Sequence, residues 1–171
     1  MMKINTKSIT RTGILLALAL VIQLMRLPQL VTGTAVNAVL LISLSTIGVL
    51  EASAIGCITP IVAFLVGIIQ PPMAPVVPFI VMSNLVLIWI VYGLRRKNIY
   101  IQIILASVGK FLFLVVAVRL ILTQFLPAPV WEKVAVAFGV TQLFTALAGG
   151  FLAILVTKLL HPYLDEEAPI E

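Results

Sequence analysis

The sequence predicts an all-α membrane protein, a compact bundle of six transmembrane helices with both termini in the cytoplasm. Of its 171 residues, 62% are hydrophobic and only 10% are charged, whereas about a quarter of the residues in an ordinary soluble domain are charged. Six apolar runs, each close to the length that crosses a bilayer, follow one another with short breaks. Basic residues gather beside alternate breaks, a pattern that orients helices in a membrane.

We expect the whole chain, residues 1–171, to form a single integral membrane domain. Six spans of ~20 residues leave no room for a soluble catalytic or nucleotide-binding domain. The expected spans cover residues 9–24, 35–50, 52–69, 76–94, 99–122 and 134–160.

The breaks between the spans follow from proline, glycine and charge. Pro28 ends the first span, and residues 29–34 are predicted to form a loop. Glu51 marks the next turn. Pro60 lies inside the third span, where a membrane helix tolerates it if a neighbour satisfies the freed carbonyl. Residues 70–75, QPPMAP, are the strongest helix breaker in the chain.

The distribution of basic residues predicts the orientation. Six spans place both termini on one side of the membrane, and basic residues favour the cytoplasmic side. Seven basic residues share the side of the termini, namely Lys3, Lys7, Arg11, Arg95, Arg96, Lys97 and Lys158. Three fall on the other side, namely Arg26, Arg119 and Lys133. The termini are therefore expected to be cytoplasmic.

Several classes of function are excluded by composition. The net charge of +5 comes from basic residues that flank apolar runs, so nucleic-acid binding is not expected. Cys57 and His161 are single residues of their kinds, and Asp165 is the only aspartate. A metal cluster, a Ser/His/Asp triad and a carboxylate pair are therefore not expected. With no phosphate-binding loop either, the chain is not expected to energise uphill transport by itself.

Lys110 is the residue that most needs an explanation. It lies at the centre of the apolar run 98–123, where a charge costs at least ~2.5 to 3.5 kcal/mol and normally faces a bundle interior or a cavity. The chain has no aspartate or glutamate at that depth to pair with it. We therefore predict that Lys110 contacts a bound solute. Snorkelling, a backbone carbonyl or a partner chain are the alternatives.

Other polar residues reach a similar depth. A helical rise of about 1.5 Å per residue places Lys110 roughly 19 Å from Thr123, Gln142 roughly 16 Å from Trp131 and Asn84 roughly 13 Å from Pro75. Helical spacing puts Phe113 on the Lys110 face, and Phe138 and Thr145 on the Gln142 face. Asn37, with Gln23 and Arg26, is a candidate cover for the same site. The alternative is that Asn84, Gln142 and Thr145 only join helices by hydrogen bonds.

The chain resembles the substrate-binding S components of energy-coupling factor (ECF) vitamin transporters. The resemblance rests on its six spans, on the opening stretch Arg11 to Leu20, RTGILLALAL, and on the first outer loop, residues 28–37. In that family, the first helix presents an Ala-x-x-x-Ala pattern to a transmembrane coupling subunit. Gly13 and Ala17 have this spacing here, with glycine in the first place.

The resemblance implies a multi-pass protein of the bacterial plasma membrane that captures a vitamin-like solute from outside. A coupling subunit and two cytoplasmic ATPases would then move the solute, so ATP would be used by these partners and no cofactor is expected in this chain. Family sites lie in the outer half of the bundle, which points to Asn84, Lys110, Gln142 and Asn37.

Two other classes of function remain open at this point. A scaffold of the cell envelope would need no cavity, and its Lys110 would pair with a partner chain. A small membrane enzyme would need catalytic groups that the sequence lacks. The solute itself is not specified: Lys110 could hold a carboxylate, or an uncharged Lys110 could bind a neutral compound.

Overall fold

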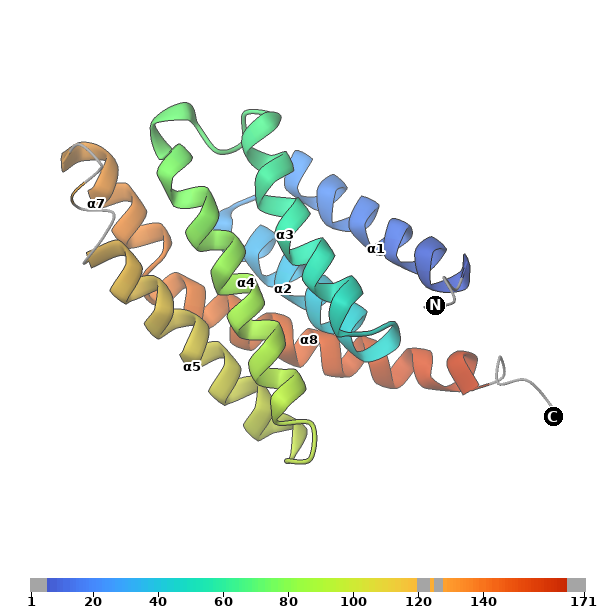
Figure 1. Ribbon diagram of the computed structural model, residues 1–171. Coiled ribbons are helices and arrows are strands. Elements are labelled where there is room, and N and C mark those ends of the chain that lie inside the picture. Colours follow the sequence, from blue (N-terminus) through green and yellow to red (C-terminus); the bar gives the residue numbers. More distant parts are fainter. Residues whose placement is uncertain (1–5, 120–123, 125–127, 166–171) are drawn as a thin grey trace.

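The computed structural model describes residues 6–119, 124 and 128–165, and helices account for nearly all of them (Figure 1). The elements are α1 (Thr6–Leu24), α2 (Gln29–Thr46), α3 (Val49–Leu65), the 3₁₀ helix η1 (Pro71–Val76), α4 (Val77–Gly93), α5 (Ile99–Ala117), α7 (Ala128–Ala137) and α8 (Val140–Asp165). Five segments of the described chain are long and apolar enough to cross a membrane. The 17-residue α3 lies at the lower limit of length for a span. The predicted helical membrane bundle is confirmed.

Helix α2 lies at the centre of the bundle. Its residues Val36–Ser43 are buried without interruption, which requires neighbours on every side of the helix. Helix α8 packs along α2, while α1, α3 and α4 contact it from other directions. Helix α5 packs against both α4 and α8 (Figure 1).

Two glycines bring neighbouring helices close together. A Cβ atom on Gly149 of α8 would lie 2.7 Å from the Asn37 Cβ of α2 and 2.7 Å from the Thr34 carbonyl oxygen. A Cβ atom on Gly56 of α3 would lie 3.3 Å from the Asn84 Cβ of α4. Small residues of this kind let membrane helices approach closely. The two contacts place Asn37 and Asn84 in the interior.

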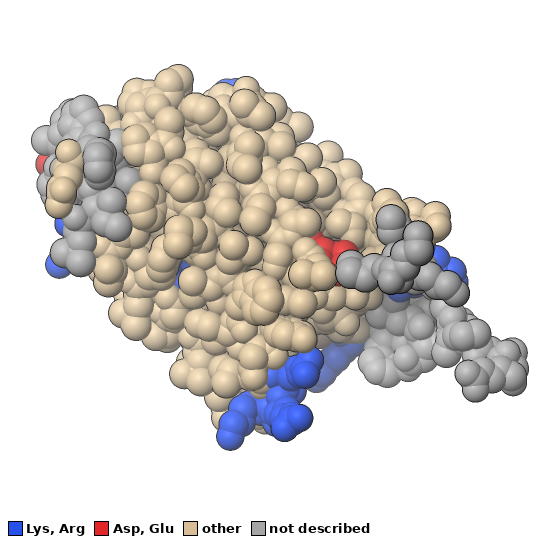
Figure 2. Space-filling model, in the orientation of Figure 1, with Lys and Arg blue, Asp and Glu red and all other residues tan. Residues whose placement is uncertain are grey.

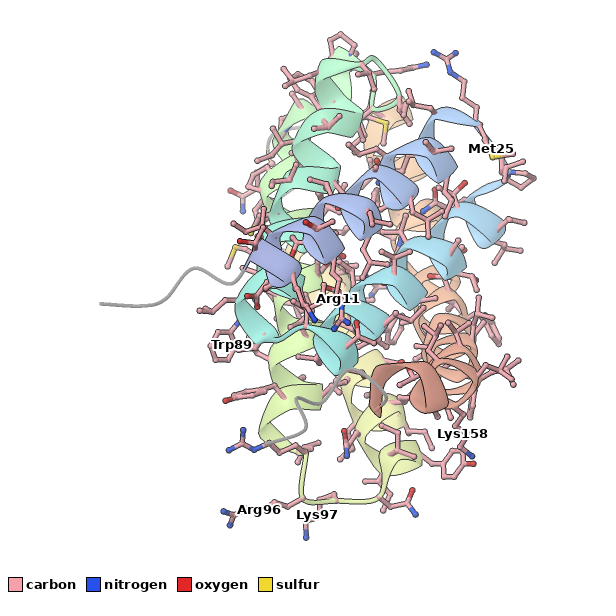
Figure 3. All side chains as sticks on the ribbon, turned by 90° about the vertical axis from the view of Figure 1, so that its right-hand side faces the viewer. Arg11, Met25, Trp89, Arg96, Lys97 and Lys158 are labelled. Carbon is pink, nitrogen blue, oxygen red and sulfur yellow. The ribbon has the colours of Figure 1, made fainter. Side chains whose placement is uncertain are left out.

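The bundle has two chemically different ends. One, here called the proline-rich end, carries the α1–α2 and α3–η1 connections with Pro28, Pro71 and Pro72. The other, called the basic end, carries the α4–α5 connection with Arg95–Lys97. The side chains of Arg96, Lys97 and Lys158 lie at the end of the bundle opposite Met25 (Figure 3). Figure 2 shows a cluster of blue side chains projecting from the lower edge of a surface that is mostly uncharged. The side of the membrane that each end faces stays a prediction.

The predicted loop at residues 29–34 is wrong, because α2 begins at Gln29. Pro28 has an extended backbone, with φ −51° and ψ 144°. Its carbonyl accepts the first hydrogen bonds of the helix, from the N–H groups of Val31 at 2.9 Å and Thr32 at 3.1 Å. The helix therefore starts directly after the proline, and Asn37 lies in its third turn instead of at its start.

Two other boundaries also differ from the prediction. The third span runs from Val49 to Leu65, so Glu51 lies in the first turn of α3, where its carboxylate accepts a hydrogen bond from Ser8 Oγ at 3.0 Å. The last predicted span, 134–160, has the bounds of a segment long and apolar enough to cross a membrane, but the chain bends within it at Phe138 and Gly139, between α7 and α8 (Figure 1). Glycine is a poor helix former, which favours the break there. Residues 120–122 of the fifth predicted span lie outside the described residues.

Candidate functional site

Lys110 lies in the interior of the bundle and is held by two asparagines. Its side chain is 3% exposed. The Nζ atom donates hydrogen bonds to Asn37 Oδ1 at 2.7 Å and to Asn84 Oδ1 at 2.9 Å. These two amide acceptors were not among the partners considered from the sequence, and the contact of Lys110 with a bound solute stays a prediction. Amide oxygens carry a partial negative charge. Hydrogen bonds to them lower the free-energy cost of burying the amine without neutralising its charge.

A proline on another helix orients Asn84. In an α-helix, the Gly56 carbonyl would accept from the N–H of residue 60, but Pro60 has no N–H. The Asn84 Nδ2 atom donates to that carbonyl at 3.0 Å instead. Because a backbone carbonyl only accepts, this bond fixes the orientation of the amide and turns Oδ1 toward Lys110.

Asn37 is oriented from the opposite side, by α8. Its Nδ2 atom donates to Thr145 Oγ1 at 3.5 Å, and the Thr145 hydroxyl donates to the Gln142 carbonyl at 3.2 Å. Lys110, Asn37, Asn84 and Thr145, here called the Lys110 cluster, thus join α5, α2, α4 and α8. All four side chains are buried.

A cavity of about 140 Å³ lies between the Lys110 cluster and the proline-rich end. Five of the seven predicted solute-binding residues line it, namely Lys110, Asn84, Asn37, Gln142 and Phe138. Thr145 acts on the cavity through Asn37. Phe113 packs instead in an apolar cluster with Phe138, Val76 and Leu114. Gln23, a predicted cover, also lines the cavity, and Arg26 is not among its lining residues.

Lys110 offers a donor and Gln23 an acceptor to a bound molecule, beside the other polar residues that line the cavity, namely Gln29, Thr32, Thr59 and Gln142. As an ammonium, Lys110 has three N–H donors, and its two hydrogen bonds to the asparagines leave one donor without an acceptor among the described residues. The Gln23 Oε1 atom is buried and accepts no hydrogen bond within the described part of the chain. Ile68, Ile69 and Ile80 form apolar walls. The arrangement suits a small, partly apolar molecule with polar groups at its edge.

Sequence reasoning missed the parts of the site that act through the backbone. Pro60 was expected to free a carbonyl that a neighbour satisfies, but Asn84 was not identified as the donor to the Gly56 carbonyl. Thr32 and Gly33, which line the cavity from α2, were assigned to a loop. The signal for the first lies in the sequence, whereas the second depends on where α2 begins.

A second cavity, of about 180 Å³, lies at the basic end between α2, α5 and α8. Leu41, Ile103 and Gly150 line its interior and Lys158 lies at its edge. None of the predicted site residues line it. Among the described residues, no three His, Cys, Asp or Glu side chains lie close enough together to hold a metal ion.

The predicted docking residues lie on the surface of α1. Gly13 and Ala17 are both exposed, and a Cβ atom on Gly13 would meet nothing within 4 Å. Ile14 and Leu18 beside them are 62% and 47% exposed. Another helix could therefore approach this face of α1 closely.

A multi-pass helical bundle with a polar cluster beside an internal cavity defines the class: an integral membrane protein with a site for a small molecule. A model of the family described as "ECF transporter, substrate-specific component" matches residues 7–161. The chain belongs to this family. It is therefore a substrate-binding component of a transporter and not an enzyme. No match was found among curated proteins or among solved structures.

Proposed function

We propose that this chain captures a small vitamin-like solute, with high affinity, in the cavity beside the Lys110 cluster. The observation that carries the proposal is the buried Nζ atom of Lys110, which lines the cavity with one N–H donor left over from its bonds to Asn37 and Asn84. A carboxylate or a carbonyl oxygen of the solute would accept that hydrogen bond. Because hydrogen bonds to charged groups are among the stronger ones in proteins, this contact would dominate recognition.

The residues of the site would have two roles, holding Lys110 in place and contacting the solute. Asn37 and Asn84 hold Lys110 in place, and Thr145 holds Asn37, so these three position the anchor. Gln142 and Phe138 lie on the cavity wall, where Phe138 would pack against an apolar part of the solute. Phe113 supports Phe138 from behind, within their shared apolar cluster.

Transport would require partner subunits. Membership of the family supports a transmembrane coupling subunit and two cytoplasmic ATPases as partners, in a bacterial plasma membrane. The exposed small residues Gly13 and Ala17 would form the docking face for the coupling subunit. Both termini and the basic end would then face the cytoplasm, and the proline-rich end would face the exterior, close to the cavity.

The direct test is to identify what the protein carries. The chain is purified gently from its native membrane, denatured, and the released small molecules are identified by mass spectrometry. One compound should be enriched over a Lys110→Met preparation made in parallel, at close to one molecule per protein chain. Equal amounts of every small molecule in the two preparations would contradict the proposal and would favour a scaffold without a solute site.

A further inference from the structure

Gln23 places an unused acceptor of α1 in the wall of the cavity. The residue lies near the end of α1, and its Oε1 atom is buried without a hydrogen-bond partner among the described residues. An unsatisfied buried acceptor costs about 1 to 3 kcal/mol, so its presence in a native structure needs an explanation. The cavity gives one, because a molecule bound there could donate to it.

The helix that carries Gln23 is loosely held. Ala19 is the only residue of α1 that is buried in this structure. Of the other helices, α2 and α3 make the main contacts with α1. Lys110, by contrast, lies on α5 and is fixed to α2 and α4 by its two hydrogen bonds. With one buried residue, against five or more in each of α2, α3, α4 and α5, α1 is held less firmly than these four helices.

We infer that the solute carries both a hydrogen-bond acceptor for Lys110 Nζ and a donor for Gln23 Oε1, and that by joining these atoms it fixes α1 against the bundle. This inference rests on the proposed function and extends it to the class of solute. Suitable compounds are small rings or chains with an N–H or O–H group near a carbonyl or carboxylate. Simple carboxylates without a donor, and permanent cations, which Lys110 would repel, are excluded.

The link has a consequence for partner binding. Gly13 and Ala17 lie on the same helix as Gln23, about 15 Å and 9 Å along its axis at 1.5 Å per residue. A solute that fixes α1 therefore also fixes the face that carries these two exposed residues. Occupancy of the cavity would thus bias the position of the docking face, since a bound molecule stabilises the arrangement to which it binds best.

The test combines the chemical structure of the solute with hydrogen exchange. The probe is the compound released from the purified parent protein and identified by mass spectrometry. It should contain at least one N–H or O–H donor as well as an acceptor. In the parent protein, adding the probe should slow amide exchange several-fold in the second half of α1 and around Lys110.

Three variants separate the role of Gln23 from a general effect on stability. Gln23→Met removes the acceptor, and should bind the probe roughly three- to tenfold more weakly, with slowed exchange around Lys110 but no longer in α1. Gln23→Glu keeps an acceptor and should keep the protection of α1. Leu24→Met, at a neighbouring side chain that is 56% exposed, should behave like the parent.

Different results would contradict the role of Gln23 and the role of Lys110. Unchanged protection of α1 in Gln23→Met, or a probe without a donor, would overturn the inference while leaving Lys110 as the anchor. If Lys110→Met binds the probe as tightly as the parent, the site itself is misplaced and the proposed function fails with it.

Discussion

At the scale of single residues, the site depends on polar groups that complete each other's hydrogen bonds. Pro60 leaves the Gly56 carbonyl without its helical partner, Asn84 satisfies that carbonyl, and the orientation imposed on the amide directs its oxygen to Lys110. A buried amine thus obtains two acceptors without any buried acid. This explains how the chain holds a lysine in its apolar interior when no carboxylate of the sequence lies at the same depth.

The hydrogen bonds that link the Gly56 carbonyl, Asn84 and Lys110 predict the effect of Pro60→Ala. Alanine restores the N–H that the Gly56 carbonyl would accept within α3, so the Asn84 amide loses its fixed orientation and Lys110 is held less firmly. Affinity for the released compound should fall about three- to twentyfold, in line with the ~0.6 to 1.7 kcal/mol of hydrogen bonds between membrane helices. Calorimetry measures this change.

The matched control for Pro60→Ala is Ile61→Ala, at the adjacent residue of α3. The Ile61 side chain is 47% exposed and does not line the cavity. This variant should bind the compound as the parent does. Equal affinity of Pro60→Ala and the parent would show that Asn84 is oriented without the proline.

At the scale of the helices, α1 differs from the rest of the bundle. Its exposed apolar residues include Ile14, Leu18 and Val21, at 62%, 47% and 54% exposure. Lipid covers such a face as well as protein does, so exposure alone does not identify a partner. The same face of α1 also carries the small residues Gly13 and Ala17, which let a second helix approach closely.

The prediction for this helix concerns Ala17→Leu. A larger side chain would hold the coupling subunit away from α1, so co-purification of this chain with that subunit should fall several-fold. Binding of the released compound to the isolated chain should be unchanged, because Ala17 points away from the cavity to the surface. Loss of solute binding with intact association would instead show that Ala17 itself contributes to the solute site and not to the docking face.

The helices also show what sequence can and cannot predict. The apolar runs coincide with helices of the bundle, and helical rise placed Lys110 and Asn84 at similar depths. For Gln142 and Phe138 the same argument assumed one continuous last helix, which the bend at Phe138 and Gly139 interrupts, although both residues line the cavity. The residues at which helices begin and end were predicted less well than the helices themselves. Pro28 stops one helix and starts the next, so residues 29–34 extend α2. The partners of Lys110 could not be predicted, because they depend on how four helices pack around one another.

At the scale of the whole molecule, the two ends suit a protein with a fixed orientation. Arg96, Lys97 and Lys158 mark the basic end (Figure 3), and the cavity lies toward the proline-rich end, beneath the α1–α2 connection. If basic residues face the cytoplasm, the solute site is nearer the exterior. That is the arrangement an importer needs.

Cysteine labelling tests this orientation in a Cys57→Ser background. Met73→Cys lies in η1 at the proline-rich end and should react with a membrane-impermeant reagent in intact cells. Arg96→Cys lies at the basic end and should react only after the membrane is permeabilised. The opposite pattern would reverse the orientation and place the cavity on the cytoplasmic side.

The central claim is that Lys110 anchors the solute, and calorimetry of the released compound with Lys110→Met tests it most directly. Methionine keeps the length of the side chain and removes its donors. Leu112→Met, at a side chain of α5 that is 53% exposed, is the matched control. Because hydrogen bonds to charged groups contribute about 1.5 to 3 kcal/mol, Lys110→Met should weaken binding at least about tenfold, and Leu112→Met should not. If folded Lys110→Met protein binds the compound as tightly as the parent, Lys110 is not the anchor.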